Sequence, residues 1–325
     1  MKFDNILLGN GISIKIYKLL ADQGLSVISF FDYLEYFCGL EEHKRERRDF
    51  FKIYKPLVYD DEIPEMLNFV EETFEEAKSI GFERMISSKV FKKPEELKRI
   101  NMTLDQYDRL IKNVASFYFL IFNYWYIKRV HNIIDYNDVA IKSLSDDIKA
   151  LVDGEVYSLN FDKLLDNFIN VKHIHGSFVD KMEKYQDIVS CMTSSTSFLY
   201  KFLFETNGYA KLFAMNQLKA NNVANFDYEF LFGDKDFGNL LIYGVSFGLS
   251  NIVPQELKGK YEDFYLTNCV EGHILVRLNA LYQMKKIKTI TIAYYSDEDK
   301  SNYQELFKFC DCKEIISFVK CSDLF

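Results

Sequence analysis

The sequence predicts an α/β fold: a Rossmann-like, doubly wound parallel sheet with a large helical insertion. Short, wholly apolar runs alternate with stretches of helical spacing, which is typical of parallel strands buried on both faces. The first run ends in a glycine-rich turn that passes directly into a helix, as in nucleotide-binding sheets. The expected strands are residues 5–8, 27–30, 156–159, 171–175, 239–243, 289–293 and 314–319.

The composition indicates a large folded protein and argues against several classes of function. Of the 325 residues, 48% are hydrophobic and 16% aromatic, which argues against disorder. The formal net charge of −8 has the wrong sign for nucleic-acid binding, and the dense basic run 43–48 is flanked by acidic residues, as on a solvated helix face. The most apolar stretch, 114–127, is shorter than the roughly 20 residues of a membrane-spanning helix, so no membrane contact is expected.

The six cysteines are scattered through the chain. This differs from the dense, paired cysteines of small secreted domains and favours reduced thiols in the cytoplasm. Only Cys310 and Cys312 lie close together, and without a second pair they are weak support for zinc. We therefore expect a cytoplasmic protein that holds no metal ion.

A glycine-rich turn follows the first predicted strand. Gly9, Asn10 and Gly11 lead into a helix over 13–20. This arrangement points backbone N–H groups and a helix N-terminus at a phosphate, and glycine lets a ligand come close because it has no Cβ. The alternative, that both glycines serve packing between a strand and a helix, is equally open.

From residue 31 to about 150 the spacing is helical. Pro64 and Pro94 each open a helix, and a capping-box pattern opens another at 103–106. We interpret 60–150 as a helical insertion between early and late strands of one sheet. The chain then divides into 1–59 and 151–325, which form the Rossmann domain, and the insertion between them.

The central stretch, residues 157–177, carries the candidate catalytic residues. It reads as strand, loop, short helix over 164–168, and strand. Asn160, Asp162 and His175 follow strand ends, where open α/β sheets bind ligands, so the three side chains are expected to face one crevice.

Each candidate has a structural alternative. Asn160 can be a turn residue and Asp162 an N-cap. His173 and His175 alternate along a predicted strand and are expected on one face, where either can be a satisfied core histidine. We prefer His175 as the catalytic residue. The pair also has the spacing of metal ligands, but no third ligand is apparent.

A second turn of small residues follows the strand at 239–243. Gly244 and Ser246 at this turn are suited to phosphate or ribose contacts. Before it, 190–197 reads as a polar loop, 198–213 as a helix and 219–238 as a turn-rich connection. Helices are expected over 272–284 and 300–309.

Four short motifs carry a resemblance to the sirtuins. Gly9 to Ser13 resembles their GAGIS turn, Asn160 to Asp162 their NID motif, His175 with Gly176 their HG, and Gly244 to Ser246 their later G-[TS]-S turn. The motifs follow the sirtuin order and cover the sheet but not the helical insertion. The two CxxC pairs of the sirtuin zinc ribbon and the PDFR segment are absent from the sequence, so the chain most resembles the sirtuin-like domains of bacterial antiphage defence that lack the ribbon, including relatives of the AbiH abortive-infection group.

The resemblance implies an NAD+ hydrolase. NAD+ is then the substrate, cleaved to ADP-ribose and nicotinamide, with no cofactor and no zinc. Backbone N–H groups at Gly9 to Ser13 would hold the pyrophosphate, with Gly244 and Ser246 as further contacts. Asn160 would bind the ribose or position water, and Asp162 would hold the nicotinamide amide or orient the ribose. His175 would accept a proton near neutral pH.

The resemblance also implies gating, because free NAD+ hydrolysis would kill the host. Homo-oligomerisation, or a sensor or activator protein, is the expected means. Two alternatives stay open: a non-catalytic sensor of a nucleotide or an ADP-ribose derivative, and a structural subunit of a defence complex.

Overall fold

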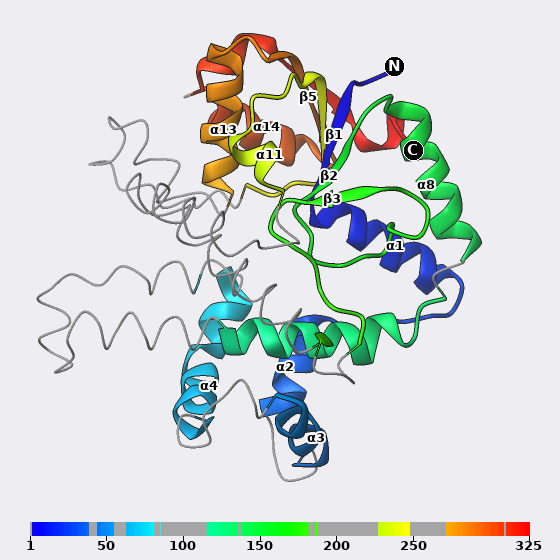
Figure 1. Ribbon diagram of the computed structural model, residues 1–325, viewed down its shortest axis with the longest axis vertical. Helices are drawn as coiled ribbons and strands as arrows, with labels where there is room; N and C mark the ends of the chain where they lie inside the picture. The colour runs from blue at the N-terminus through cyan, green and yellow to red at the C-terminus, as the bar shows by residue number, and fades with distance from the viewer. Residues whose placement is uncertain are drawn as a thin grey trace, which may run out of the picture.

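The structure is a computed structural model, shown in Figure 1. It describes residues 2–38, 44–54, 63–80, 85, 116–135, 138–181, 186–187, 227–247, 271–308 and 310–325.

A six-stranded, fully parallel sheet forms the centre of the molecule. Its strand order is β3-β2-β1-β4-β5-β6, which is the order of dinucleotide-binding Rossmann sheets. The α/β fold expected from the sequence is thus confirmed. The strands are β1 (Asn5–Leu8), β2 (Val156–Ser158), β3 (Val171–His173), β4 (Gly238–Tyr243), β5 (Ile287–Tyr294) and β6 (Ile316–Lys320).

The strands are apolar because helices cover both faces of the sheet. Side chains alternate along β1: Ile6 and Leu8 belong to one hydrophobic cluster, and Leu7 belongs to the other. Both faces of the central strand are therefore buried, and the run of hydrophobic residues has no polar alternation.

The two faces are covered by different helices (Figure 1). The helices α1 (Asn10–Asp22) and α8 (Val139–Leu151) pack together and share the cluster of Ile6 and Leu8. The helices α11 (Tyr228–Phe232), α13 (Gly272–Gln283) and α14 (Asp297–Phe307) share the cluster of Leu7. The C-terminal part adds the 3₁₀ helices η5 (Asp311–Ile315) and η6 (Cys321–Asp323).

A separate group of helices lies beyond the carboxyl ends of the central strands (Figure 1). It contains α2 (Phe30–Cys38), α3 (Lys44–Tyr54), α4 (Ile63–Ile80) and a helix over 116–125 that continues as the π-helix η3 (Tyr126–His131). We call this group the helical layer. Its interior is largely aromatic: Phe50 packs edge-to-face on Phe37, Phe117 and Tyr124.

The helical layer includes elements on both sides of residue 60. The helices α2 and α3 precede that position; α2 contacts α4, and Phe37 of α2 packs on Phe50 of α3. By contrast, α8 falls within 60–150 but packs on the sheet beside α1. The domain boundaries expected from the sequence stay predictions.

Several local predictions are wrong. No strand forms at 27–30: residues 25–29 are irregular, Phe30 begins α2, and the backbone oxygen of Ile28 accepts a hydrogen bond from Trp125 Nε1 at 2.9 Å. Residues 164–168 form turns rather than a short helix. The third strand ends at His173, and residues 174–175 turn away from the sheet.

The predictions at 94, 103–106, 190–197 and 198–213 lie outside the described residues, as does most of 219–238. Among the residues that are described, no helix is long and apolar enough to cross a membrane.

Candidate functional site

A cavity of about 530 Å³ opens where the order of the strands reverses. In the sheet, β1 lies between β2 and β4. The loops after all three strands reach the cavity. The helical layer supplies the opposite wall. The lining includes Gly9, Asn10, Asn160, Asp162 and Ser246 from the sheet side, Phe30, Phe122, Trp125 and Phe178 as aromatic residues, and Glu271.

Three polar side chains form one hydrogen-bonded network beside the cavity: Asn160 and Asp162 follow β2 and line the cavity, and Ser13 belongs to α1. Asn160 Nδ2 donates to Ser13 Oγ at 2.8 Å and to the backbone oxygen of Gly9 at 3.1 Å. Ser13 Oγ donates to Asp162 Oδ2 at 2.6 Å. The sequence-based expectation that Asn160 and Asp162 share one crevice agrees with this geometry.

Asp162 has an altered proton affinity. Burial raises the pKa of its carboxyl group above the ordinary value, and the hydrogen bonds from Ser13 and from the backbone of Leu164 offset only part of that rise. A carboxyl group whose pKa is shifted towards neutral, on the wall of a cavity, is suited to accept or hold a proton during a reaction.

His173 positions Asn160. Its Nδ1 lies 2.8 Å from the backbone oxygen of Asn160, and its Nε2 lies 3.2 Å from both carboxylate oxygens of Asp166. Both ring nitrogens therefore face acceptors, which favours the doubly protonated imidazolium. Burial alone would lower the pKa of His173, but the bond to Asp166 and the Asn160 oxygen outweigh it, and the pKa is raised.

The glycines of the first turn serve close packing. A Cβ on Gly11 would lie 2.6 Å from Gly244 Cα, and a Cβ on Gly9 would lie 2.6 Å from Val245 Cα. The N–H groups of Gly9 and Gly11 donate to the backbone oxygens of Tyr243 and Gly244, so the prediction that these two groups hold a phosphate is wrong. Gly244 has a φ of +66. Gly9 and Asn10 line the cavity at the N-terminus of α1, whereas Gly11 faces the turn after β4.

Of the two residues predicted in the second turn, one lines the cavity and the other packs against the first turn. Ser246 is exposed and lines the cavity. Gly244 packs against Gly11, so its contribution is to bring the loop after β4 close to the loop after β1.

His175 takes a different position from the one expected. Its side chain is 0% exposed, and its Nε2 lies 3.4 Å from Glu271 Oε2. It is absent from the cavity lining, although Glu271 belongs to it. The two histidines do not share a face, because the strand ends at His173 and the turn after it redirects His175. The role of His175 as a proton acceptor stays a prediction.

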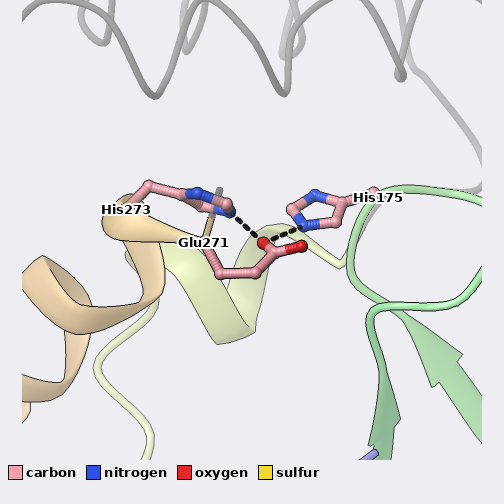
Figure 2. A group of neighbouring side chains, drawn as sticks. All are labelled: His175, Glu271 and His273. Carbon is pink, nitrogen blue, oxygen red and sulfur yellow. Dashed lines mark hydrogen bonds and ion pairs between the residues drawn. The ribbon is translucent and has the colours of Figure 1, made fainter. Parts of the chain in front are cut away.

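A second histidine completes this cluster (Figure 2). His273, in the first turn of α13, directs Nε2 to Glu271 Oε2 at 3.7 Å. The two imidazole rings lie 4.9 Å apart, and one ligand atom from each of the three residues falls within 4.8 Å of the others. These are residue types that hold divalent metal ions.

Sequence reasoning missed His173 as a positioning residue, and it missed both Glu271 and His273. The only available signal for the last two was an acidic residue and a histidine flanking Gly272 at the start of a predicted helix, a pattern too common to indicate a site. No family model, no curated protein and no solved structure matches this chain.

Proposed function

We propose that the protein hydrolyses NAD+ at the bond between nicotinamide and ribose. The observation that carries this proposal is the cavity at the strand reversal, with Asn160 and Asp162 on its wall and Ser13 linking them behind it. Open α/β sheets bind nucleotides at this place, and the network adds polar groups that can act on a bound ribose.

The lining suits the parts of a dinucleotide. Gly9 and Asn10 lie at the N-terminus of α1, where the helix dipole favours a pyrophosphate. Phe122 and Trp125 stack on each other with ring centroids 5.4 Å apart, and both line the cavity. Such an aromatic wall suits a nicotinamide or adenine ring.

The reaction requires little covalent chemistry from the protein. The bond from ribose C1′ to the nicotinamide nitrogen breaks, its electron pair stays on nicotinamide, and positive charge builds on the ribose. Water then bonds to C1′ and releases one proton. In our proposal Asn160 orients the ribose or the water, and Asp162 accepts the proton.

In a cell this activity requires control. We propose that the protein is a gated effector of bacterial antiphage defence, controlled by homo-oligomerisation or by a sensor or activator protein. This part of the proposal rests on the resemblance of the four sequence motifs.

The direct test is release of nicotinamide from NAD+ by purified protein, followed by mass spectrometry. Asn160→Ala should lower the rate at least about 10²-fold. Asn239→Ala is the matched control, because Asn239 lies at the amino end of β4, away from the cavity. If the pure protein is silent, NAD+ is measured in phage-challenged cells that carry the wild type or Asn160→Ala. Equal NAD+ levels in the two cultures would contradict the proposal.

A nucleotide sensor is the second candidate. The complete burial of His175 favours it, since the residue expected to accept the proton does not line the cavity. A sensor would bind NAD+ or ADP-ribose with measurable heat in calorimetry and release no nicotinamide, in vitro or in challenged cells.

A further inference from the structure

We infer that His175, Glu271 and His273 form a binding site for a divalent metal ion of the zinc class. The three side chains come from the loop after β3 and from the start of α13 (Figure 2). The inference goes beyond NAD+ hydrolysis and departs from the sequence-based expectation of a protein without metal.

The hydrogen bond between His175 Nε2 and Glu271 Oε2 is long, and the spacing of the ligand atoms also suits a bound ion. A charge-assisted N–H···O bond is about 2.7–2.9 Å long. The two histidine nitrogens lie 3.4 Å and 3.7 Å from Glu271 Oε2, clearly longer than that. A tetrahedral ion with bonds of about 2.0–2.1 Å separates its ligand atoms by about 3.3–3.4 Å.

The class of ion follows from the ligand types. Imidazole nitrogens suit zinc and similar transition metals, whereas magnesium and calcium prefer oxygen ligands. The third separation is at most 4.8 Å. Two imidazoles and one carboxylate in a tetrahedral arrangement are a ligand set of zinc sites that keep one position open.

Burial supports the inference independently of the distances. The side chains of His175, Glu271 and His273 are 0%, 8% and 3% exposed. A carboxylate removed from water needs a compensating positive charge, and a divalent cation between it and two neutral imidazoles supplies one. His173 takes no part, because its nitrogens face Asn160 and Asp166.

Position gives the site its significance. Glu271 lines the cavity as well as approaching both histidines, so an ion here lies beside the proposed nucleotide site. His175 then serves as a metal ligand rather than as the proton acceptor, which leaves that task to Asp162.

The test is metal binding by the full chain, measured without NAD+, so that it stands or fails separately from the proposed hydrolysis. Protein is stripped with a chelator and titrated with zinc, and with cobalt(II) as a spectroscopic probe. We expect one zinc per chain by elemental analysis and the visible absorption of tetrahedral cobalt(II) with nitrogen and oxygen ligands. Stripped protein that keeps its near-ultraviolet circular dichroism but takes up neither ion overturns the inference.

Variants then locate the ion. Glu271→Gln and His273→Ala should weaken zinc binding by more than the roughly 10–100-fold typical of removing an outer-shell partner. His131→Gln is the matched control, since His131 lies 3.8 Å from the Asp180 carboxylate but outside the cluster. The inference is also overturned if both Glu271→Gln and His273→Ala bind zinc with the affinity of the wild type. A thiolate charge-transfer band in the cobalt(II) spectrum would overturn it as well, because it would place the ion at the cysteines. If a variant does not fold, the wild-type cobalt spectrum decides.

Discussion

Ser13 links the two candidate catalytic side chains, and its hydroxyl has both hydrogen-bonding capacities in use. It accepts from Asn160 and donates to Asp162, and it is almost completely buried. The bond to Asp162 stabilises the ionised carboxylate and so holds its pKa below the value that burial alone would impose.

Removing the Ser13 hydroxyl should therefore raise the pKa of Asp162 further. If Asp162 must be ionised to accept a proton, the acidic limb of the pH profile for nicotinamide release moves to higher pH in Ser13→Ala. Ser145→Ala is the control, because Ser145 is also buried but bonds to the Ile141 oxygen within α8. A pH profile that keeps its acidic limb in Ser13→Ala would exclude Asp162 as the proton acceptor.

His173 makes a separate prediction about stability. Its folded pKa is raised above 6.5, so the protonated ring stabilises the fold fully below that pH, and the contribution is lost as pH rises through the folded pKa. The free energy of unfolding in urea should fall from pH 6.5 upward in the wild type, and less in His173→Gln.

His131 provides a control of opposite sign. Burial lowers the pKa of His131, so its contribution is present above the ordinary value and is lost as pH falls through the folded pKa. In His131→Gln the free energy of unfolding should still fall above pH 6.5, as it does in the wild type. If His173→Gln and the wild type lose stability in parallel across this range, the imidazolium assignment is wrong.

The sequence could predict the site residues that directly follow a strand, but not those that meet only through the packing of a helix. Asn160 and Asp162 follow β2, and Gly9 follows β1; the rule that ligands bind at the carboxyl ends of parallel strands needs only local patterns. His175 and Glu271 are 96 residues apart and meet only because α13 packs on the face opposite α1. No local pattern contains that contact.

Tertiary contacts and strand ends also explain why two local predictions are wrong. Residues 27–30 have the composition of a strand, but tertiary contacts override that propensity: Phe30 packs on Phe122 and Trp125 as the first residue of α2. Strand alternation predicts one face for His173 and His175, but the alternation ceases to apply because β3 ends at His173.

At the scale of elements, the contact between the turns after β1 and β4 should be intolerant of any side chain. A Cβ on Gly11 would lie 2.6 Å from Gly244 Cα, a backbone atom that cannot move away cheaply. Gly11→Ala should lower the free energy of unfolding by about 1–3 kcal/mol. Val139→Ala is the control, because Val139 is 79% exposed at the start of α8 and its truncation leaves no cavity. Equal stability of Gly11→Ala and wild type in urea unfolding would show that the turns separate more easily than the geometry indicates.

At the scale of the whole molecule, the cavity lies between the sheet and the helical layer. Trp125 and Phe122 line it from the helical layer, and Asn160 and Gly9 line it from strand ends. The two parts are also joined directly, since Tyr126 Oη accepts from the backbone N–H of Lys163 at 3.2 Å, and Asn123 Oδ1 accepts from that of Val179 at 2.9 Å. A nucleotide in the cavity would touch both parts and add to these links.

Ligand binding should consequently stabilise the whole protein. A ligand that binds only the folded state at 100 times its Kd adds about 2.7 kcal/mol to the free energy of unfolding. ADP-ribose, the proposed product, avoids turnover and should raise the thermal midpoint in proportion to the logarithm of its concentration. Trp125→Ala should reduce that rise by weakening the aromatic wall, and Asn160→Ala should reduce it by removing a polar contact. Val139→Ala is the control, because Val139 is 79% exposed at the start of α8 and does not line the cavity. The nucleotide would not bind between the sheet and the helical layer if ADP-ribose does not move the midpoint of the wild type. The same would follow if it moves the midpoints of Trp125→Ala and Asn160→Ala as far as that of the wild type.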